Sequence, residues 1–127
     1  MKYPVHESDT GSFQELVRRG DLEFGQLSIL EIAPGCSRGG HYHRRKHEWF
    51  CCIKGICELV AASQLHEVTF TLQGDQREFI RVPAGMSHTL SNVGQVDFDT
   101  TCLVLVIASE PYDPDDPDTF TLEELSR

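Results

Sequence analysis

The sequence predicts an all-β protein, a single-domain antiparallel β-barrel that spans residues 1–127. Three observations predict it. Short segments rich in apolar, β-branched and aromatic residues recur along the chain, separated by turn residues about every eight to twelve positions. The clearest segment alternates apolar and polar residues with a period close to two, which suits a half-buried strand. A chain of 127 residues is long enough for one hydrophobic core but too short for two.

Each expected element has a local reason. Residues 1–12 are polar and contain several turn formers, so we expect an N-terminal arm, and residues 13–19 could form a strand or a short helical turn. Residues 27–32 alternate and stop at a Pro-Gly pair, which predicts a strand followed by a turn. The other expected elements are a hairpin of residues 49–53 and 56–61, strands at 68–72, 78–82 and 101–108, and at most one short C-terminal helix at 121–125.

Two groups of histidines predict a metal site. His41 and His43 are two residues apart, so on a strand they point to the same face. Glu48 can return to that face after a tight connection, and His88 can approach it from a second hairpin. Three imidazoles and one carboxylate suit Zn²⁺, Fe²⁺, Mn²⁺ or Ni²⁺ better than Ca²⁺ or Mg²⁺. We therefore expect one divalent ion, with zinc first; the alternatives are unrelated histidines on polar loops and a site that has lost its metal.

Charge is unevenly distributed along the chain. The formal net charge of −9 argues against nucleic acid and anionic membranes as partners. Seven of the twenty acidic residues lie within residues 110–124, whereas Arg38, Arg44, Arg45 and Lys46 surround the histidine motif. Such a cationic rim suits an anionic small molecule, for example a phosphate or diphosphate ester, bound by Arg38, Arg44 and Lys46. A basic turn that is merely solvated is the alternative.

Cysteine usage and apolar segments indicate the cellular context. Five cysteines without a disulfide-type spacing fit the reducing cytoplasm. No basic segment is followed by an apolar stretch, so we expect no signal peptide, and the longest apolar run, residues 102–108, is too short to span a bilayer.

Two expected strands, residues 49–53 and 102–108, are apolar on both faces. One face meets the barrel interior, and the other also needs cover from water. A second subunit is the simplest cover, so we expect a homodimer; an arm of the same chain is the alternative.

The spacing of the two histidine groups resembles the double signature of the cupin superfamily. The matching positions are Gly35, His41, His43, Glu48 and Gly55, then Pro83, Gly85, His88 and Asn92. In cupins the residues that match the three histidines and the glutamate hold one divalent metal inside a small jelly-roll barrel. The one departure is Gly74, which lies nine residues before Pro83, farther than the family's glycine, and indicates a longer hairpin.

Two further segments resemble cupins that act on nucleotide-linked sugars. Residues 38–47 are similar to the R-G-x-H-x-H segment of 3,4-ketoisomerases of TDP-linked 4-keto-6-deoxy sugars. Residues 108–120 are similar to the end of the cupin domain in bifunctional UDP-sugar epimerase-reductases of capsule synthesis. The ketoisomerases generally carry glutamine at the position of Glu48 and work without a metal, whereas the capsule-enzyme cupin binds zinc. Both families tend to have arginine where this chain has Thr10.

The resemblance implies an isomerase of surface-polysaccharide biosynthesis, either a C3 epimerase or a 3,4-ketoisomerase. Both reactions remove a proton next to a carbonyl, which requires a group that stabilises the enolate and a base. If a metal is bound, His41 and His43 are ligands, and the base is expected to be His47 or Tyr112. Without a metal, His41 and His43 themselves form the acid-base pair. An iron-dependent dioxygenase and a non-catalytic ligand-binding module are the alternatives.

Overall fold

The computed structural model describes residues 2–93 and 100–121, in which every strand pair is antiparallel and no helix occurs. The all-β, antiparallel prediction is therefore confirmed. Of the helix expected at 121–125, Thr121 belongs to a strand and the rest lies outside the described residues. The strands are β1 (Val5–Ser8), β2 (Gly11–Gln14), β3 (Gln26–Ile32), β4 (Ser37–Tyr42), β5 (Glu48–Lys54), β6 (Ile56–Ala62), β7 (Glu67–Gln73), β8 (Ile80–Val82), β9 (Ser87–Asn92), β10 (Cys102–Ala108) and β11 (Phe120–Thr121).

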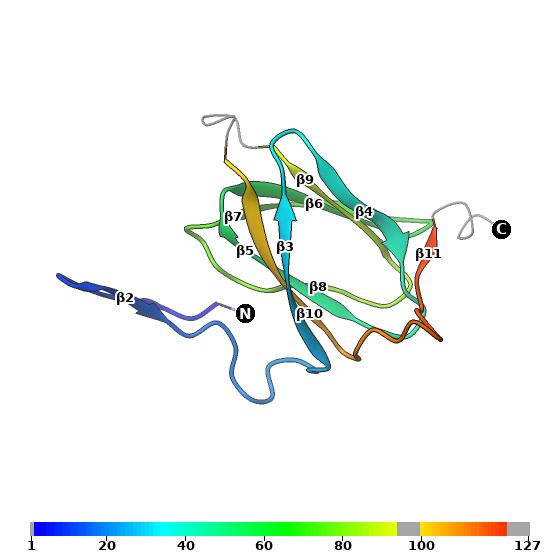
Figure 1. The fold of residues 1–127 in the computed structure, drawn as a ribbon, viewed down its shortest axis with the longest axis horizontal. Helices are drawn as coiled ribbons and strands as arrows, with labels where there is room; N and C mark the ends of the chain where they lie inside the picture. The colour runs from blue at the N-terminus through cyan, green and yellow to red at the C-terminus, as the bar shows by residue number, and fades with distance from the viewer. Residues whose placement is uncertain (1, 94–99, 122–127) are drawn as a thin grey trace.

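Two sheets face each other to form the barrel (Figure 1). One sheet has the order β3-β10-β5-β8, and the other has the order β11-β4-β9-β6-β7. β5 and β6 flank Gly55, as expected, but β5 pairs with β10 and β8, whereas β6 pairs with β7 and β9. The predicted hairpin of residues 49–53 and 56–61 is therefore wrong. The turn at Gly55, where φ is +85°, carries the chain from one sheet to the other.

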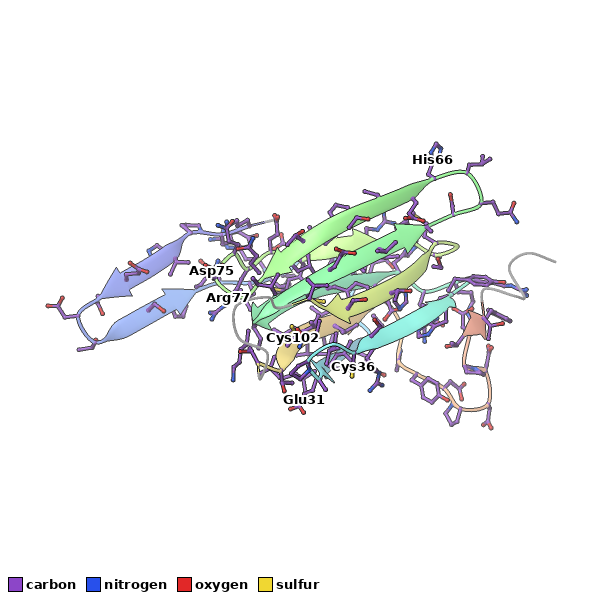
Figure 2. The ribbon with its side chains drawn as sticks, turned by 90° about the horizontal axis from the view of Figure 1, so that it is seen from above. Glu31, Cys36, His66, Asp75, Arg77 and Cys102 are labelled. Carbon is purple, nitrogen blue, oxygen red and sulfur yellow. The ribbon has the colours of Figure 1, made fainter. Side chains whose placement is uncertain are left out.

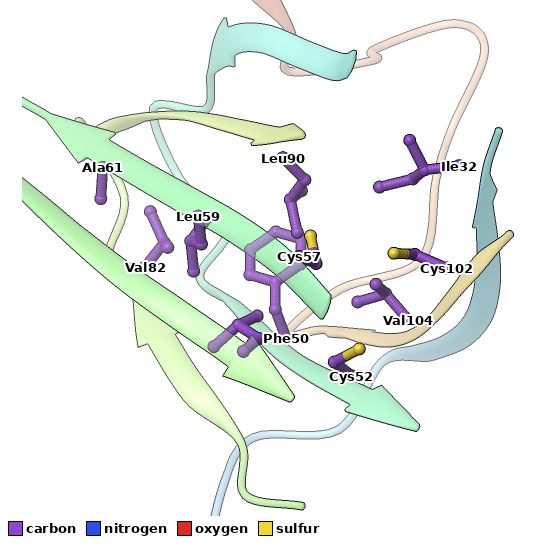
Figure 3. Close-up of a cluster of buried hydrophobic side chains, with 11 residues drawn as sticks. Ile32, Phe50, Cys52, Cys57, Leu59, Ala61, Val82, Leu90, Cys102 and Val104 are labelled. Carbon is purple, nitrogen blue, oxygen red and sulfur yellow. The ribbon is translucent and has the colours of Figure 1, made fainter. Parts of the chain in front are cut away.

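Alternate residues of both sheets fill the barrel interior (Figure 3). Phe50 and Val104 from one sheet contact Leu59 and Leu90 from the other, and each is at most 2% exposed. Burying a side chain of this size stabilises the fold by roughly 1.5–3 kcal/mol. Four of the five cysteines are also buried, and Cys36 is exposed.

The outer face of the β5–β10 pair is covered by the same chain. Trp49, Cys51 and Ile107 form a second buried cluster on this face. The segment between β2 and β3 packs against them through Leu16, Val17 and Leu22. This is the alternative cover considered from the sequence, so these two strands no longer require a partner subunit; the homodimer itself stays a prediction.

Part of the expected N-terminal arm is a hairpin. β1 and β2 pair over Val5–Gln14, and their side chains are exposed except for that of Gln14, which is half-buried. Figure 2 shows this hairpin extending away from the barrel. Nowhere in the described part of the chain is there a helix with the length and apolar character needed to span a membrane.

Candidate metal centre and anion site

His41 and His88 face each other from neighbouring strands. They are partners in the antiparallel register of β4 and β9, and their ring centroids lie 4.6 Å apart. This register is irregular between Gly39 and His41, and Gly39 has a φ of +106°. A Cβ atom at position 39 would lie 2.6 Å from the main-chain oxygen of His88. Glycine at this position therefore allows the close strand approach that sets His41 opposite His88.

His43 lies one residue beyond β4 and joins the other two histidines from a loop. Its ring centroid is 5.2 Å from that of His41 and 5.5 Å from that of His88. Its main-chain oxygen accepts the N–H of Gly85 at 2.6 Å, so the turn before β9 supports this loop. Potential ligand atoms of the three histidines all lie within 4.8 Å of one another. The three predicted histidines therefore meet in a geometry that could hold a metal ion.

Glu48 reaches the histidines from the opposite sheet, as the first residue of β5. Its Oε1 atom lies 2.5 Å from His43 Nε2 and 3.7 Å from His88 Nε2. Both Glu48 Oε1 and His43 Nε2 are buried, and neither has a well-aligned hydrogen-bond partner among the described residues. Because buried polar atoms are normally satisfied, a cation bound here would supply the missing partner. These residues therefore fit a divalent metal, and the potential ligand atoms of the three histidines are the ones that lie close to one another.

Burial sets the protonation of the site. It lowers the pKa of His88 to about 4, although the charge of Glu48 opposes this shift. Burial and the neighbouring His43 also lower the pKa of His41. Burial alone would raise the pKa of the Glu48 carboxyl, but His43 and His88 lower it overall. At neutral pH His41 and His88 are therefore neutral and Glu48 is charged, which are the states that bind a metal.

A cavity of about 430 Å³ opens beside these residues, and Lys46 is its most unusual lining residue. Lys46 is only 7% exposed. Its Nζ atom donates to the main-chain oxygen of Pro117 at 3.4 Å and lies 5.7 Å from the ring centroid of Tyr112. Among the described residues no carboxylate pairs with this ammonium group. The charge of Glu48 acts on Lys46 only from a distance, so an anion in the cavity would give this buried ammonium a direct partner.

The other cations of the predicted rim lie in different places. Arg38 lines the cavity. Arg44 is not among the described residues that line it; its guanidinium lies 4.0 Å from the ring centroid of Phe120. Arg45 forms ion pairs with Glu110 at 2.7 Å and with Asp116 at 3.0 Å. The cavity therefore brings together Arg38 and Lys46 of the expected substrate contacts, without Arg44.

The two residues expected to transfer a proton beside a bound metal are also separated. Tyr112 lines the cavity and is 57% exposed. His47 is not among the described lining residues, and its Nδ1 accepts a hydrogen bond from the main-chain N–H of Ala84 at 3.0 Å. Arg81 lies 3.2 Å from the same nitrogen. The structure therefore places Tyr112 at the cavity and turns the imidazole of His47 toward the connection between β8 and β9.

Asp118 is a residue of the site that the sequence analysis does not single out. Its main-chain oxygen accepts a hydrogen bond from His43 Nδ1–H, and the two atoms lie 2.6 Å apart. Its carboxylate accepts the main-chain N–H groups of Arg44, Arg45 and Lys46. The available sequence signal was its place in the segment 108–120, where nothing distinguishes it from the neighbouring acidic residues.

Comparisons with known proteins agree with this fold and site. Residues 6–120 match the family model of the polysaccharide biosynthesis C-terminal domain. The chain is 33% identical over 119 residues to UDP-2-acetamido-2,6-beta-L-arabino-hexul-4-ose reductase of Pseudomonas aeruginosa, covering 92% of this chain and 30% of that protein. It superposes on the capsular polysaccharide assembling protein CapF of Staphylococcus aureus with a TM-score of 0.71 and 29% identity, over 94% of this chain and 34% of CapF. The chain thus spans about a third of the length of these two relatives.

A more distant structure has nearly the same length as this chain. QdtA, a sugar 3,4-ketoisomerase from Thermoanaerobacterium thermosaccharolyticum whose structure contains TDP, superposes with a TM-score of 0.78 over 97% of this chain and 86% of QdtA. At 17% identity this likeness shows a shared fold. Together the comparisons confirm the resemblance to sugar-nucleotide cupins.

Proposed function

The chain belongs to the polysaccharide biosynthesis C-terminal domain family, and we propose that it is a metal-binding isomerase of a nucleotide-linked 4-keto-6-deoxy sugar. The reaction is either C3 epimerisation or 3,4-ketoisomerisation, in surface-polysaccharide biosynthesis. One observation carries the proposal: the three histidines and Glu48 line the same cavity as the buried Lys46. A group that can stabilise an enolate thus lies beside a group that can bind a phosphate.

Lys46 and Arg38 are the proposed contacts of the nucleotide diphosphate. Lys46 is buried, and its ammonium group donates a long hydrogen bond to the neutral main-chain carbonyl of Pro117. A diphosphate oxygen would replace that weak contact with a charge-assisted hydrogen bond. Arg38 lines the same cavity and adds a second cation, which leaves the sugar ring beside the histidines.

His41, His43, His88 and Glu48 would hold the metal, with zinc as the expected ion. A divalent ion bound there would act as a Lewis acid on the sugar carbonyl. Tyr112 lines the cavity and is the proposed base for the proton at C3. If no metal is used, His41 and His43 are the proposed acid-base pair, since their ring centroids lie 5.2 Å apart.

Apolar side chains complete the cavity wall. Leu30 and Val106 come from one sheet and Leu90 from the other. Such a wall limits the access of water to the reacting carbon, and it strengthens the interactions of the charged groups with the substrate. The sugar therefore meets polar groups at the histidines and the cations, and apolar contacts elsewhere.

The test is incubation with TDP- or UDP-linked 4-keto-6-deoxy sugars in D₂O, followed by NMR. In the presence of the protein, and not without it, the proposal expects deuterium at C3 of an epimerised sugar, or at C4 of a product whose ketone has moved to C3. Oxygen consumption with added iron and no exchange would instead support the dioxygenase. Sugar-nucleotide binding without exchange or oxygen consumption would support a non-catalytic binding module. Either of these results overturns the isomerase.

The homodimer remains part of the proposal. The β5 and β10 faces that motivated it are covered by Leu16, Val17 and Leu22 of the same chain. Exposed apolar side chains remain on β3, where Leu27 is 55% and Ile29 is 58% exposed. Light scattering at micromolar concentration should report twice the chain mass of 14.3 kDa, and a mass of one chain would refute the dimer.

A further inference from the structure

Asp118 stands out from its segment in two respects. Its side chain is buried, with 4% of the residue exposed, although the surrounding segment is exposed. It is also the one non-glycine residue with a positive φ in the described part of the chain, at +50°. Aspartate tolerates this conformation better than most residues other than glycine, because its short side chain can hydrogen-bond nearby backbone groups. A buried carboxylate needs hydrogen-bond partners, so the contacts of Asp118 must compensate for its burial.

The carboxylate of Asp118 binds three successive main-chain N–H groups. Oδ1 accepts the N–H of Arg44 at 2.9 Å, and Oδ2 accepts those of Arg45 at 3.0 Å and Lys46 at 3.1 Å. These residues connect β4 to β5, so the carboxylate fixes the backbone of this loop. A fixed backbone at residues 44–46 determines which side chain of the loop enters the cavity, and that side chain is Lys46.

The main-chain carbonyl of the same residue acts on the histidines. It accepts a hydrogen bond from His43 Nδ1–H at a distance of 2.6 Å. Because Nδ1 donates to Asp118, Nε2 is the nitrogen of His43 that is left for a metal, and it lies 2.5 Å from Glu48 Oε1. In metal sites, such outer contacts set the tautomer and the ring orientation of the ligand, and their loss typically weakens metal binding by about 10- to 100-fold.

We propose that Asp118 is a positioning residue that sets both halves of the cavity. Its carbonyl holds His43 with Nε2 free to bind a metal or a proton, and its carboxylate holds the 44–46 backbone so that Lys46 faces the anion. Asp118 acts through His43 and Lys46. The inference rests on the metal and anion sites of the proposed function, and it is independent of which sugar reaction occurs.

The first test needs only the unaltered, metal-free chain. Long-range ¹H–¹⁵N NMR spectra of the histidine rings distinguish the two neutral tautomers. The proposal expects His43 to carry its proton on Nδ1. A His43 ring with a proton on Nε2 and none on Nδ1 would overturn it, whatever the protein catalyses and whether or not it binds a metal.

The second test compares Asp118→Asn with Asp115→Asn. Asparagine tolerates a positive φ and has almost the same shape, but its amide NH₂ cannot accept the loop N–H groups. Asp115 is exposed in the same acidic segment, so its substitution controls for the lost charge. Asparagine keeps the main-chain carbonyl, but releasing the backbone of residues 44–46 also loosens the adjoining His43. We therefore expect Asp118→Asn to bind Co²⁺ about 10-fold or more weakly, with a changed visible absorption spectrum and mixed His43 tautomers. We expect the control to match the unaltered chain.

A purely structural role would give a different result. Asp118→Asn would then lower the thermal unfolding midpoint while Co²⁺ affinity, the Co²⁺ spectrum and the His43 tautomer stayed unchanged, and the proposal would fail. If circular dichroism shows that the variant does not fold, the His43 tautomer measured in the unaltered chain tests the proposal instead. If the unaltered chain binds no Co²⁺, the proposed metal site fails, and the same tautomer measurement still tests Asp118.

Discussion

His41 and His88, on paired strands, and Lys46, on a loop, reach the same cavity by different routes. His41 and His88 are register partners on β4 and β9, so main-chain pairing and the barrel core set their distance. Lys46 lies on the loop before β5, and its backbone is held by a carboxylate 72 residues further along the chain. Groups on paired strands are thus positioned by the main-chain register of the two strands, whereas Lys46 on the loop depends on one remote residue.

Neighbouring cations show the consequence. Arg45 and Lys46 are adjacent and carry the same charge, yet Arg45 is ion-paired at the surface and Lys46 is buried at the cavity. Loop geometry, which charge and spacing do not reveal, separates them. The comparison predicts that loss of a strand-borne histidine removes the activity, while loss of a cation, Lys46 on the loop or Arg38 on β4, weakens ligand binding.

The largest effect is expected from His41→Ala. This substitution removes either a metal ligand or one member of the acid-base pair, so deuterium exchange should fall to background under both mechanisms. His66→Ala is the control, because His66 is exposed at the β6–β7 turn (Figure 2) and is not among the described residues that line the cavity. Exchange that survived in His41→Ala would remove this histidine from the site.

Glu48→Gln separates the two mechanisms. Elemental analysis of the unaltered protein should show about one metal equivalent, and the substitution should reduce it well below that, because the amide carries no charge. Lost exchange activity would support the use of a metal, and retained activity would support the histidine pair. Glu31→Gln, at an exposed position of β3, should leave the metal content unchanged. Full metal content in Glu48→Gln would refute this carboxylate as a ligand.

Gly39→Ala tests the register that brings His41 to His88. The added Cβ would lie 2.6 Å from the main-chain oxygen of His88, and φ is +106°. Strain and overpacking together should lower the free energy of unfolding by about 3 kcal/mol or more. Gly40→Ala is the matched control: its φ is +80°, but no atom lies within 4 Å of the new Cβ, so about 1 kcal/mol is expected. Equal losses in urea unfolding would contradict the argument.

The smallest effect is expected at the cations. Lys46→Ala and Arg38→Ala should each weaken TDP or UDP binding about tenfold or more, since a charge-assisted hydrogen bond contributes roughly 1.5–3 kcal/mol. Arg45→Ala should leave the affinity nearly unchanged, because Arg45 pairs with Glu110 and Asp116. Isothermal titration calorimetry measures the affinity of all three variants. A large loss of affinity in Arg45→Ala would contradict the placement of Arg45 outside the ligand site.

Local pattern in the sequence was sufficient for the fold class and for much of the histidine site. The period-two alternation of residues 27–32 became β3, and the apolar run at 101–108 became β10, because side-chain alternation is a property of a single strand. The same property explains why His41 and His43 could be expected on one face. His88 could be assigned to the same site only through the resemblance to the cupin signature, because the sequence around His88 does not show which strand it pairs with.

Tertiary structure decided the features that depend on distant pairing. β5 and β6 read as a hairpin, but each joins a different sheet because its hydrogen-bonding partners come from elsewhere in the chain. Asp118 resembles the four other acidic residues of segment 108–120, and only the approach of the loop at residues 44–46 makes its carboxylate and carbonyl part of the site. The sequence specifies the chemistry of each side chain. The contacts of that side chain depend on which segments the folded barrel brings within hydrogen-bond distance.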